Sequence, residues 1–230
     1  MTGHWARLAR ETVTRAAKVS LAIRGLPPGL DRSIMGLYSD NGWPVLRCDL
    51  TSALAAAAEQ RRAAVLRVDG PADAAVTTTA ILTGRLEMIG HAREHGRHVS
   101  SVMLALERVV VETREPGWPA VTRPIPVADY TATDPARLAA SARYLAEHTN
   151  EAHGGDLRRL AAARTGVPGA DLAAAWLADL NLGGAKLSWI GPDGGRTAEV
   201  SFPRQARTLT ELSLLLRQQI GSGDVRGERP

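Results

Sequence analysis

Residues 34–47 read Ile-Met-Gly-Leu-Tyr-Ser-Asp-Asn-Gly-Trp-Pro-Val-Leu-Arg, and they specify how the first half of the chain is built. Two apolar runs, 34–38 and 43–47, flank the dipeptide Asn41-Gly42. Both residues of this dipeptide tolerate a positive φ, which a type I′ turn demands at its two central positions. The stretch therefore predicts a tight antiparallel hairpin.

Further strand patterns surround this hairpin, at residues 19–23, 63–68, 76–89 and 102–112. The Ala-rich segment 52–62 predicts one interposed helix, and Gly84 predicts a β-bulge within a long strand. Several strands with a single helix favour an α+β fold with a small antiparallel β-barrel over residues 18–115. The sequence has no GxGxxG or Walker loop, so an alternating nucleotide-binding βαβ sheet is not expected.

The segments that precede and follow this barrel are predicted to have different structures. Residues 1–17 predict an amphipathic basic helix, because Trp5, Leu8 and Val13 recur at helical spacing. We interpret it as a helix that packs on the barrel; contact with a membrane or RNA is the alternative. Residues 116–133 are rich in proline and are predicted to form a linker.

The C-terminal part is predicted to be a helix–hairpin–helix domain over residues 134–220. Asp134-Pro135 fits an N-cap followed by proline at the first helical position. Thr208 and Glu211 form a capping box that opens the last helix. The remaining predicted elements are a second helix at 171–180, a hairpin at 186–202 and a disordered tail at 221–230.

Composition narrows the class of protein. The single cysteine, Cys48, excludes an intramolecular disulfide and a zinc site built on several thiolates. No stretch approaches the ~18 apolar residues of a membrane span, and the charged N-terminus is unlike a secretory signal. The formal charge of +4 lies mostly in residues 1–18, so nucleic-acid binding is not expected. We expect a cytoplasmic protein without a membrane span.

The C-terminal part resembles a small domain of unknown function that accompanies the haem-utilisation (HugZ-like) members of the flavin-binding split-barrel superfamily. The resemblance rests on Tyr144-Leu-Ala-Glu-His-Thr-Asn-Glu-Ala-His-Gly-Gly-Asp156-Leu and on Phe202-Pro-Arg204. It implies an FMN-binding-like split barrel ahead of this domain, a homodimer with ligand sites between the subunits, and a tetrapyrrole, haem, as the ligand.

The same resemblance leaves three functions open. The first is a haem-binding protein, able to degrade haem in an oxygenase-like reaction with an external reductant. The second is a flavin-dependent oxidoreductase with FMN; Arg47, Arg61 and Arg62 lie in the vicinity where flavin-binding relatives place phosphate ligands. The third is a non-catalytic regulator or binding protein whose barrel has lost its cofactor.

His148 and His153 carry the family motif and are the first candidates for the axial ligand that haem iron needs. On a regular helix, positions five apart point ~140° away from each other, so the two are not expected to hold one ion together. One would face a ligand while the other, with Asn150, bonds backbone or the neighbouring domain. Alternatively, the motif only holds the domain together. Gly154-Gly155 weakens a helix that runs on in relatives.

His91, His95 and His98 form a second candidate set. If residues 90–100 are helical, the three imidazoles share one face that a metal or a haem edge could use. A solvated loop is the alternative. Cys48 is the third candidate, because a thiolate can ligate haem and Arg47 favours ionisation. A small buried hydrophobic residue is the alternative for Cys48.

Overall fold

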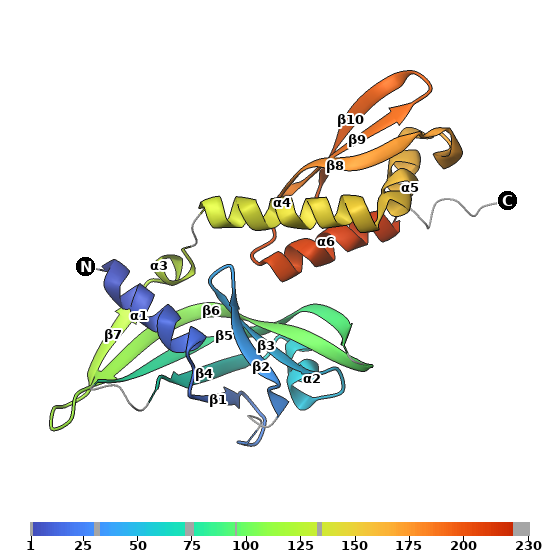
Figure 1. Ribbon diagram of the computed structural model, residues 1–230. Coiled ribbons are helices and arrows are strands. Elements are labelled where there is room, and N and C mark those ends of the chain that lie inside the picture. The colour runs from blue at the N-terminus through green and yellow to red at the C-terminus, as the bar shows by residue number, and fades with distance from the viewer. Residues whose placement is uncertain (1, 30–32, 72–75, 95, 133–134, 223–230) are drawn as a thin grey trace. The chain divides into compact units, whose positions relative to one another are not determined.

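The computed structural model describes residues 2–29, 33–71, 76–94, 96–132 and 135–222. The chain divides into two compact units, Met1–Ala132 and Thr133–Pro230. The first unit contains a seven-stranded antiparallel sheet and the second a three-stranded antiparallel sheet, each with its own helices (Figure 1). The chain is therefore an α+β protein. None of the described helices is both long and apolar enough to cross a membrane.

The first unit is built around its long central strands. Its elements are α1 (Thr2–Thr14), β1 (Lys18–Ile23), β2 (Gly36–Asp40), β3 (Trp43–Asp49), α2 (Ala53–Glu59), β4 (Ala63–Asp69), β5 (Thr77–Glu94), β6 (Arg97–Arg114), β7 (Val121–Ile125) and α3 (Val127–Thr131). The strands pair in the order β1-β4-β5-β6-β3-β2, and β7 also pairs with β6. Among the described residues no pairing of β1 with β2 closes this sheet into a barrel.

The predicted hairpin between β2 and β3 is confirmed. Asn41 and Gly42 have φ values of 52° and 79°, and Asp40 pairs with Trp43 across the turn. A Cβ on Gly42 would lie 2.8 Å from the carbonyl oxygen of Thr131 in α3. Glycine therefore serves both the turn conformation and the close approach of α3.

A β-bulge occurs at the predicted position, although the extra residue, Glu107, lies in the partner strand β6. The register between β5 and β6 shifts between Thr83 and Gly84. A Cβ on Gly84 would lie 2.1 Å from the carbonyl oxygen of Ala105, a distance that no side chain tolerates. The bulge thus depends on the absence of a side chain at this position.

Helix α1 packs on the sheet, as its apolar spacing predicts. Ala6, Ala9 and Val13 are buried in the core of the first unit. The guanidinium of Arg10 donates hydrogen bonds to the carbonyl oxygens of Asp129 (2.7 Å) and Tyr130 (2.9 Å) in α3. These bonds hold α1 against α3.

The segment 116–133 contains regular structure where the sequence predicted a linker. Strand β7 pairs with β6, and Tyr130 of α3 is buried in the core. The prolines mislead because Pro124 lies in a strand at the edge of the sheet, where a missing N–H donor is tolerated. This segment therefore completes the first unit.

The second unit contains α4 (Pro135–Ala152), α5 (Gly154–Thr165), a 3₁₀ turn at Gly169–Asp171, β8 (Ala174–Asn181), β9 (Gly184–Gly191), β10 (Gly194–Ser201) and α6 (Leu209–Ser222). The three strands pair in the order β10-β9-β8. Asp134 of the predicted N-cap and residues 223–230 of the predicted tail lie outside the described residues, and 221–222 belong to α6.

The helix predicted at 171–180 is wrong, because this segment forms β8. The register between β8 and β9 shifts between Leu177 and Asp179, so Ala178 is an extra residue. The bulge turns both Leu177 and Leu180 to the core, where they are buried. Two buried leucines three residues apart imitate the spacing of a helix, although the backbone is extended.

Candidate functional site

The segment that carries the sequence resemblance, residues 144–157, lies where α4 ends and α5 begins. His153 stands between the two helices with φ of −126° and ψ of 26°, outside the helical region, and Gly154 and Gly155 follow it. Figure 1 shows α5 leaving the end of α4 in a new direction. The two glycines, which disfavour a continuous helix, coincide with this break.

The break brings His148 and His153 together. Their ring centroids lie 6.1 Å apart, with the ring planes at 83° in an edge-to-face arrangement. The expectation that they diverge was wrong, because it assumed a regular helix through His153. The motif thus places two imidazoles beside each other at the α4–α5 junction.

Asp156 orients one of these imidazoles. Its Oδ2 lies 3.2 Å from Nδ1 of His153, and its other carboxylate oxygen accepts a hydrogen bond from the guanidinium of Arg159. In the tautomer of His153 that donates from Nδ1 to the carboxylate, Nε2 carries a lone pair. Nitrogen Nε2 is therefore the atom of His153 that can bind a ligand.

Both histidines are exposed, and their imidazoles line a partly open cavity of about 320 Å³ between α4, α5 and α6. Leu145, Leu216 and Ile220 contribute apolar wall, and Arg159 and Arg217 contribute positive charge. Arg217 makes no ion pair with the residues that the structure describes. The cavity can therefore accept an apolar group that carries negative charge and binds to imidazole nitrogen.

Asn150 lies between the two histidines in the sequence. Its side chain binds the backbone of β8. Its side-chain Nδ2 donates to the carbonyl oxygen of Leu177 (3.0 Å), and its Oδ1 accepts from the N–H of Leu177 (2.7 Å). These two bonds hold β8 at its bulge. Asn150 therefore stabilises the domain instead of facing the histidine cavity.

A larger groove of about 860 Å³ lies between α4 and the β8–β9 hairpin, and Asn150 lines it. Its α4 wall is mostly alanine, and its other polar lining residues include Arg143, Glu147 and Asp179. No histidine or cysteine lines this groove. Despite its size it lacks the nitrogen ligands that the smaller cavity contains.

The second histidine set does not form a helical face. Residues 90–94 end β5 and residues 97–100 begin β6, and Gly96 before β6 has a φ of 82°. His91 Nδ1 lies 3.1 Å from the hydroxyl of Ser100, and His98 is exposed. His95 lies outside the described residues. No group of three or more His, Cys, Asp or Glu side chains that could hold a metal ion is found in the described part of the chain.

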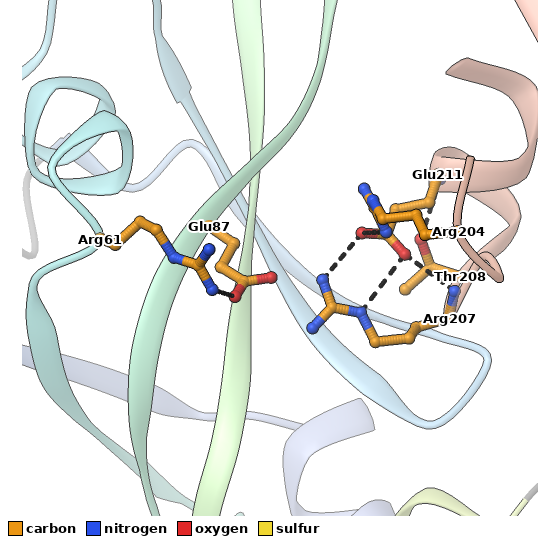
Figure 2. Close-up of polar contacts among 6 residues, drawn as sticks. All are labelled: Arg61, Glu87, Arg204, Arg207, Thr208 and Glu211. Carbon is orange, nitrogen blue, oxygen red and sulfur yellow. Dashed lines mark hydrogen bonds and ion pairs between the residues drawn. The ribbon is translucent and has the colours of Figure 1, made fainter. Parts of the chain in front are cut away.

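Arg61 and Arg62, two of the three arginines that the sequence offered as phosphate ligands, bind different partners. Arg61 forms an ion pair with Glu87 of β5 (Figure 2). Arg62 donates from Nε to Gln60 (2.7 Å) and from its guanidinium toward the backbone carbonyl at position 24 (3.4 Å). Arg47 lies half-buried on β3. Arg61 and Arg62 therefore do not converge on one group.

Cys48 is fully buried in the core of the first unit. Burial raises the pKa of its thiol, a hydrogen bond with Ser52 lowers it, and the nearby charge of Asp49 raises it, so that the net direction is upward. A thiol with a raised pKa is a poor source of thiolate. This environment fits a small buried hydrophobic residue.

A second polar cluster in this unit surrounds Glu211 at the start of α6 (Figure 2). Arg204 and Arg207 each place a guanidinium nitrogen 2.9 Å from Oε1 of Glu211, and the backbone N–H of Arg207 donates to Oε2 at 2.8 Å. The hydroxyl of Thr208 accepts from the N–H of Glu211 (3.0 Å), as a capping box requires. The Phe202-Pro-Arg204 sequence thus supplies one cation of this cluster.

The charge of Glu211 is retained in spite of burial. Its side chain is fully buried, and burial alone would raise the pKa of the carboxyl. Hydrogen bonds and positive charge from Arg207, together with the charge of Arg204, outweigh that effect and hold the pKa below its usual value. Both carboxylate oxygens of Glu211 are bound within the cluster, and the cluster stabilises the start of α6.

Sequence reasoning missed three residues of the histidine cavity. Asp156 and Arg159 follow His153 at intervals of three, the spacing of neighbours on a helix, so that signal was present. Arg217 lies far away in the sequence and carries no local signal. Only the packing of α6 beside α4 and α5 brings it to the cavity.

Solved structures resemble this chain along nearly its whole length. A heme binding protein from Mycobacterium smegmatis matches with 14% identity and a TM-score of 0.38, covering 98% of each chain. The protein Atu2129, of unknown function, from Agrobacterium tumefaciens matches with 18% identity and a TM-score of 0.39, covering 94% of each chain. No family model and no curated protein matches the sequence. At similarity this low, neither likeness says which ligand the chain binds.

Proposed function

We propose that this chain binds haem through the histidine pair at the α4–α5 junction. One observation carries the proposal: His148 and His153 stand together at a cavity, and a carboxylate holds Nδ1 of His153. Imidazole is a usual axial ligand of haem iron. A ligating histidine almost always donates its other ring N–H to a carboxylate, carbonyl or water, which is the arrangement of His153 and Asp156.

The surroundings of the two imidazoles fit a tetrapyrrole in chemistry. Leu145, Leu216 and Ile220 offer apolar surface to a macrocycle, and Arg159 and Arg217 offer cations to its carboxylates. Haem bound there supplies a redox-active iron. The chain's own residues would hold it: His153 would bind through Nε2, Asp156 would fix the imidazole ring of His153, and Arg217, with a smaller part for Arg159, would pair with the carboxylates.

The size of the cavity bears on the assembly that we propose. A volume of about 320 Å³ lies near the lower end of ligand pockets, which span about 300–1,000 Å³, so the cavity takes one edge of the macrocycle. We propose that the seven-stranded sheet is a split barrel that pairs as a homodimer, as the sequence resemblance implies.

The proposal is tested by titrating the purified chain with hemin. We expect a saturable Soret band at one haem per chain. His153→Ala should weaken binding about tenfold or more, and added imidazole should restore the band, because the free base replaces the missing ligand. His98→Ala serves as the control. It removes an exposed imidazole from the first unit and should bind hemin like the unaltered protein.

Three other outcomes would change the conclusion. Hemin uptake that never saturates and ignores His148→Ala and His153→Ala would overturn the proposal. Stoichiometric retention of flavin by the same preparation would favour the flavin-dependent alternative. Bleaching of the bound haem by ascorbate under air would extend the proposal to haem degradation, whereas a stable band would favour a carrier or regulator.

A further inference from the structure

The charges of the histidine cavity are not balanced. Asp156 is its one carboxylate lining residue, and it is already bound by His153 and Arg159. Arg217 has no such partner among the described residues. The cavity therefore has one guanidinium for which the described part of the chain provides no counter-ion.

This guanidinium belongs to the face of α6 that lines the cavity. Ser213, Leu216, Arg217 and Ile220 are the positions i, i+3, i+4 and i+7 of one helical stripe, and all four line the cavity. Leu216 is buried beside Arg217. Arg217, an exposed residue, thus lines the cavity next to the apolar wall that Leu216 and Ile220 contribute.

We infer that Arg217 determines specificity by binding a carboxylate of the tetrapyrrole. This inference rests on the proposed haem function. Arginine suits the role because its planar fork can bind both oxygens of a carboxylate at once. Arg159 contributes less, because its guanidinium is already held by Asp156.

The test compares hemin with hemin dimethyl ester, in which both carboxylates are masked, on the full-length chain in one co-solvent. We expect the unaltered protein to bind hemin about fivefold more tightly than the ester, the size of one half-exposed charged pair. Arg217→Gln should weaken hemin binding to the level of the ester and leave ester binding unchanged. Arg217→Lys should keep part of the preference.

Arg158→Gln is the matched control, because it removes the same charge from an exposed position of α5 that does not line the cavity. It should preserve the preference for hemin. Equal binding of hemin and ester by the unaltered protein, or a preference that survives Arg217→Gln, would overturn the inference while haem binding stands. If neither compound binds saturably, the proposed function fails, and the inference fails with it.

Discussion

Two clusters of the C-terminal unit in which arginine binds a carboxylate differ in how far their carboxylates are buried. Glu211 has a fully buried side chain held by Arg204 and Arg207. Asp156 has a side chain that is 32% exposed, is bound by His153 and Arg159, and borders a cavity. The same pairing of residue types therefore stabilises structure in one place and orients a candidate ligand in the other. The two clusters differ because the carboxylate of Glu211 is fully buried, whereas the carboxylate of Asp156 is partly exposed beside a cavity.

The largest effect is expected from breaking the cluster around Glu211. Glu211→Gln removes the charge that two guanidinium groups share, and it places an amide donor among N–H donors. We expect the free energy of unfolding in urea to fall by about 3 kcal/mol, the scale for removing one partner of a buried ion pair. Glu199→Gln on the exposed face of β10 is the control and should change it by less than about 0.5 kcal/mol. Equal effects of the two substitutions would contradict the structural role of Glu211.

The pH dependence of stability tests the role of Glu211 in a second way. The pKa of Glu211 is lower in the folded chain than its ordinary value of 4.5, so the carboxylate stabilises the fold above that pH. As the pH falls below 4.5, the unfolded chain takes up the proton first, and this stabilisation is lost progressively until the folded pKa is passed. Unfolding free energies measured between pH 7 and pH 3 should therefore fall more steeply for the unaltered protein than for Glu211→Gln. Parallel curves would show that Glu211 has no shifted pKa.

The cluster around Asp156 should respond in ligand binding more than in stability. Asp156→Asn removes a carboxylate that is about one-third exposed, and ion pairs near the surface contribute at most about 1 kcal/mol to stability. The same change removes the group that orients His153, so hemin affinity should fall about tenfold, the scale for losing the hydrogen-bond partner of a metal ligand. Urea unfolding and Soret titration of one preparation measure both quantities. A large loss of stability with unchanged hemin affinity would place Asp156 with Glu211 as a structural residue.

Local signals in the sequence predicted the parts of the fold that local chemistry determines. Asn41-Gly42 marks its turn because both residues adopt positive φ, and Gly84 marks its bulge because no side chain fits there. Thr208 and Glu211 mark the start of α6 because each side chain bonds backbone within the same turn. Each of these features depends either on residues close together in the sequence or on a position where only glycine fits.

The errors arose where a local pattern had two structural readings. The leucines of β8 keep a helical spacing because a bulge inserts Ala178 between them, and Asn150, far away in the sequence, stabilises that bulge. The histidines were assigned to opposite faces because a regular helix was assumed through His153. Arg217 could not be found at all, because only tertiary packing brings α6 to the cavity.

The central claim is that the open junction between α4 and α5, and not the β5–β6 hairpin, binds the ligand. The most direct measurement is a Soret titration with hemin of two double variants, His148→Ala/His153→Ala and His91→Ala/His98→Ala, each lacking two imidazoles. We predict that the first variant loses saturable binding and that the second binds hemin with unaltered affinity. Saturable binding that survives in the first variant and disappears in the second would contradict the account.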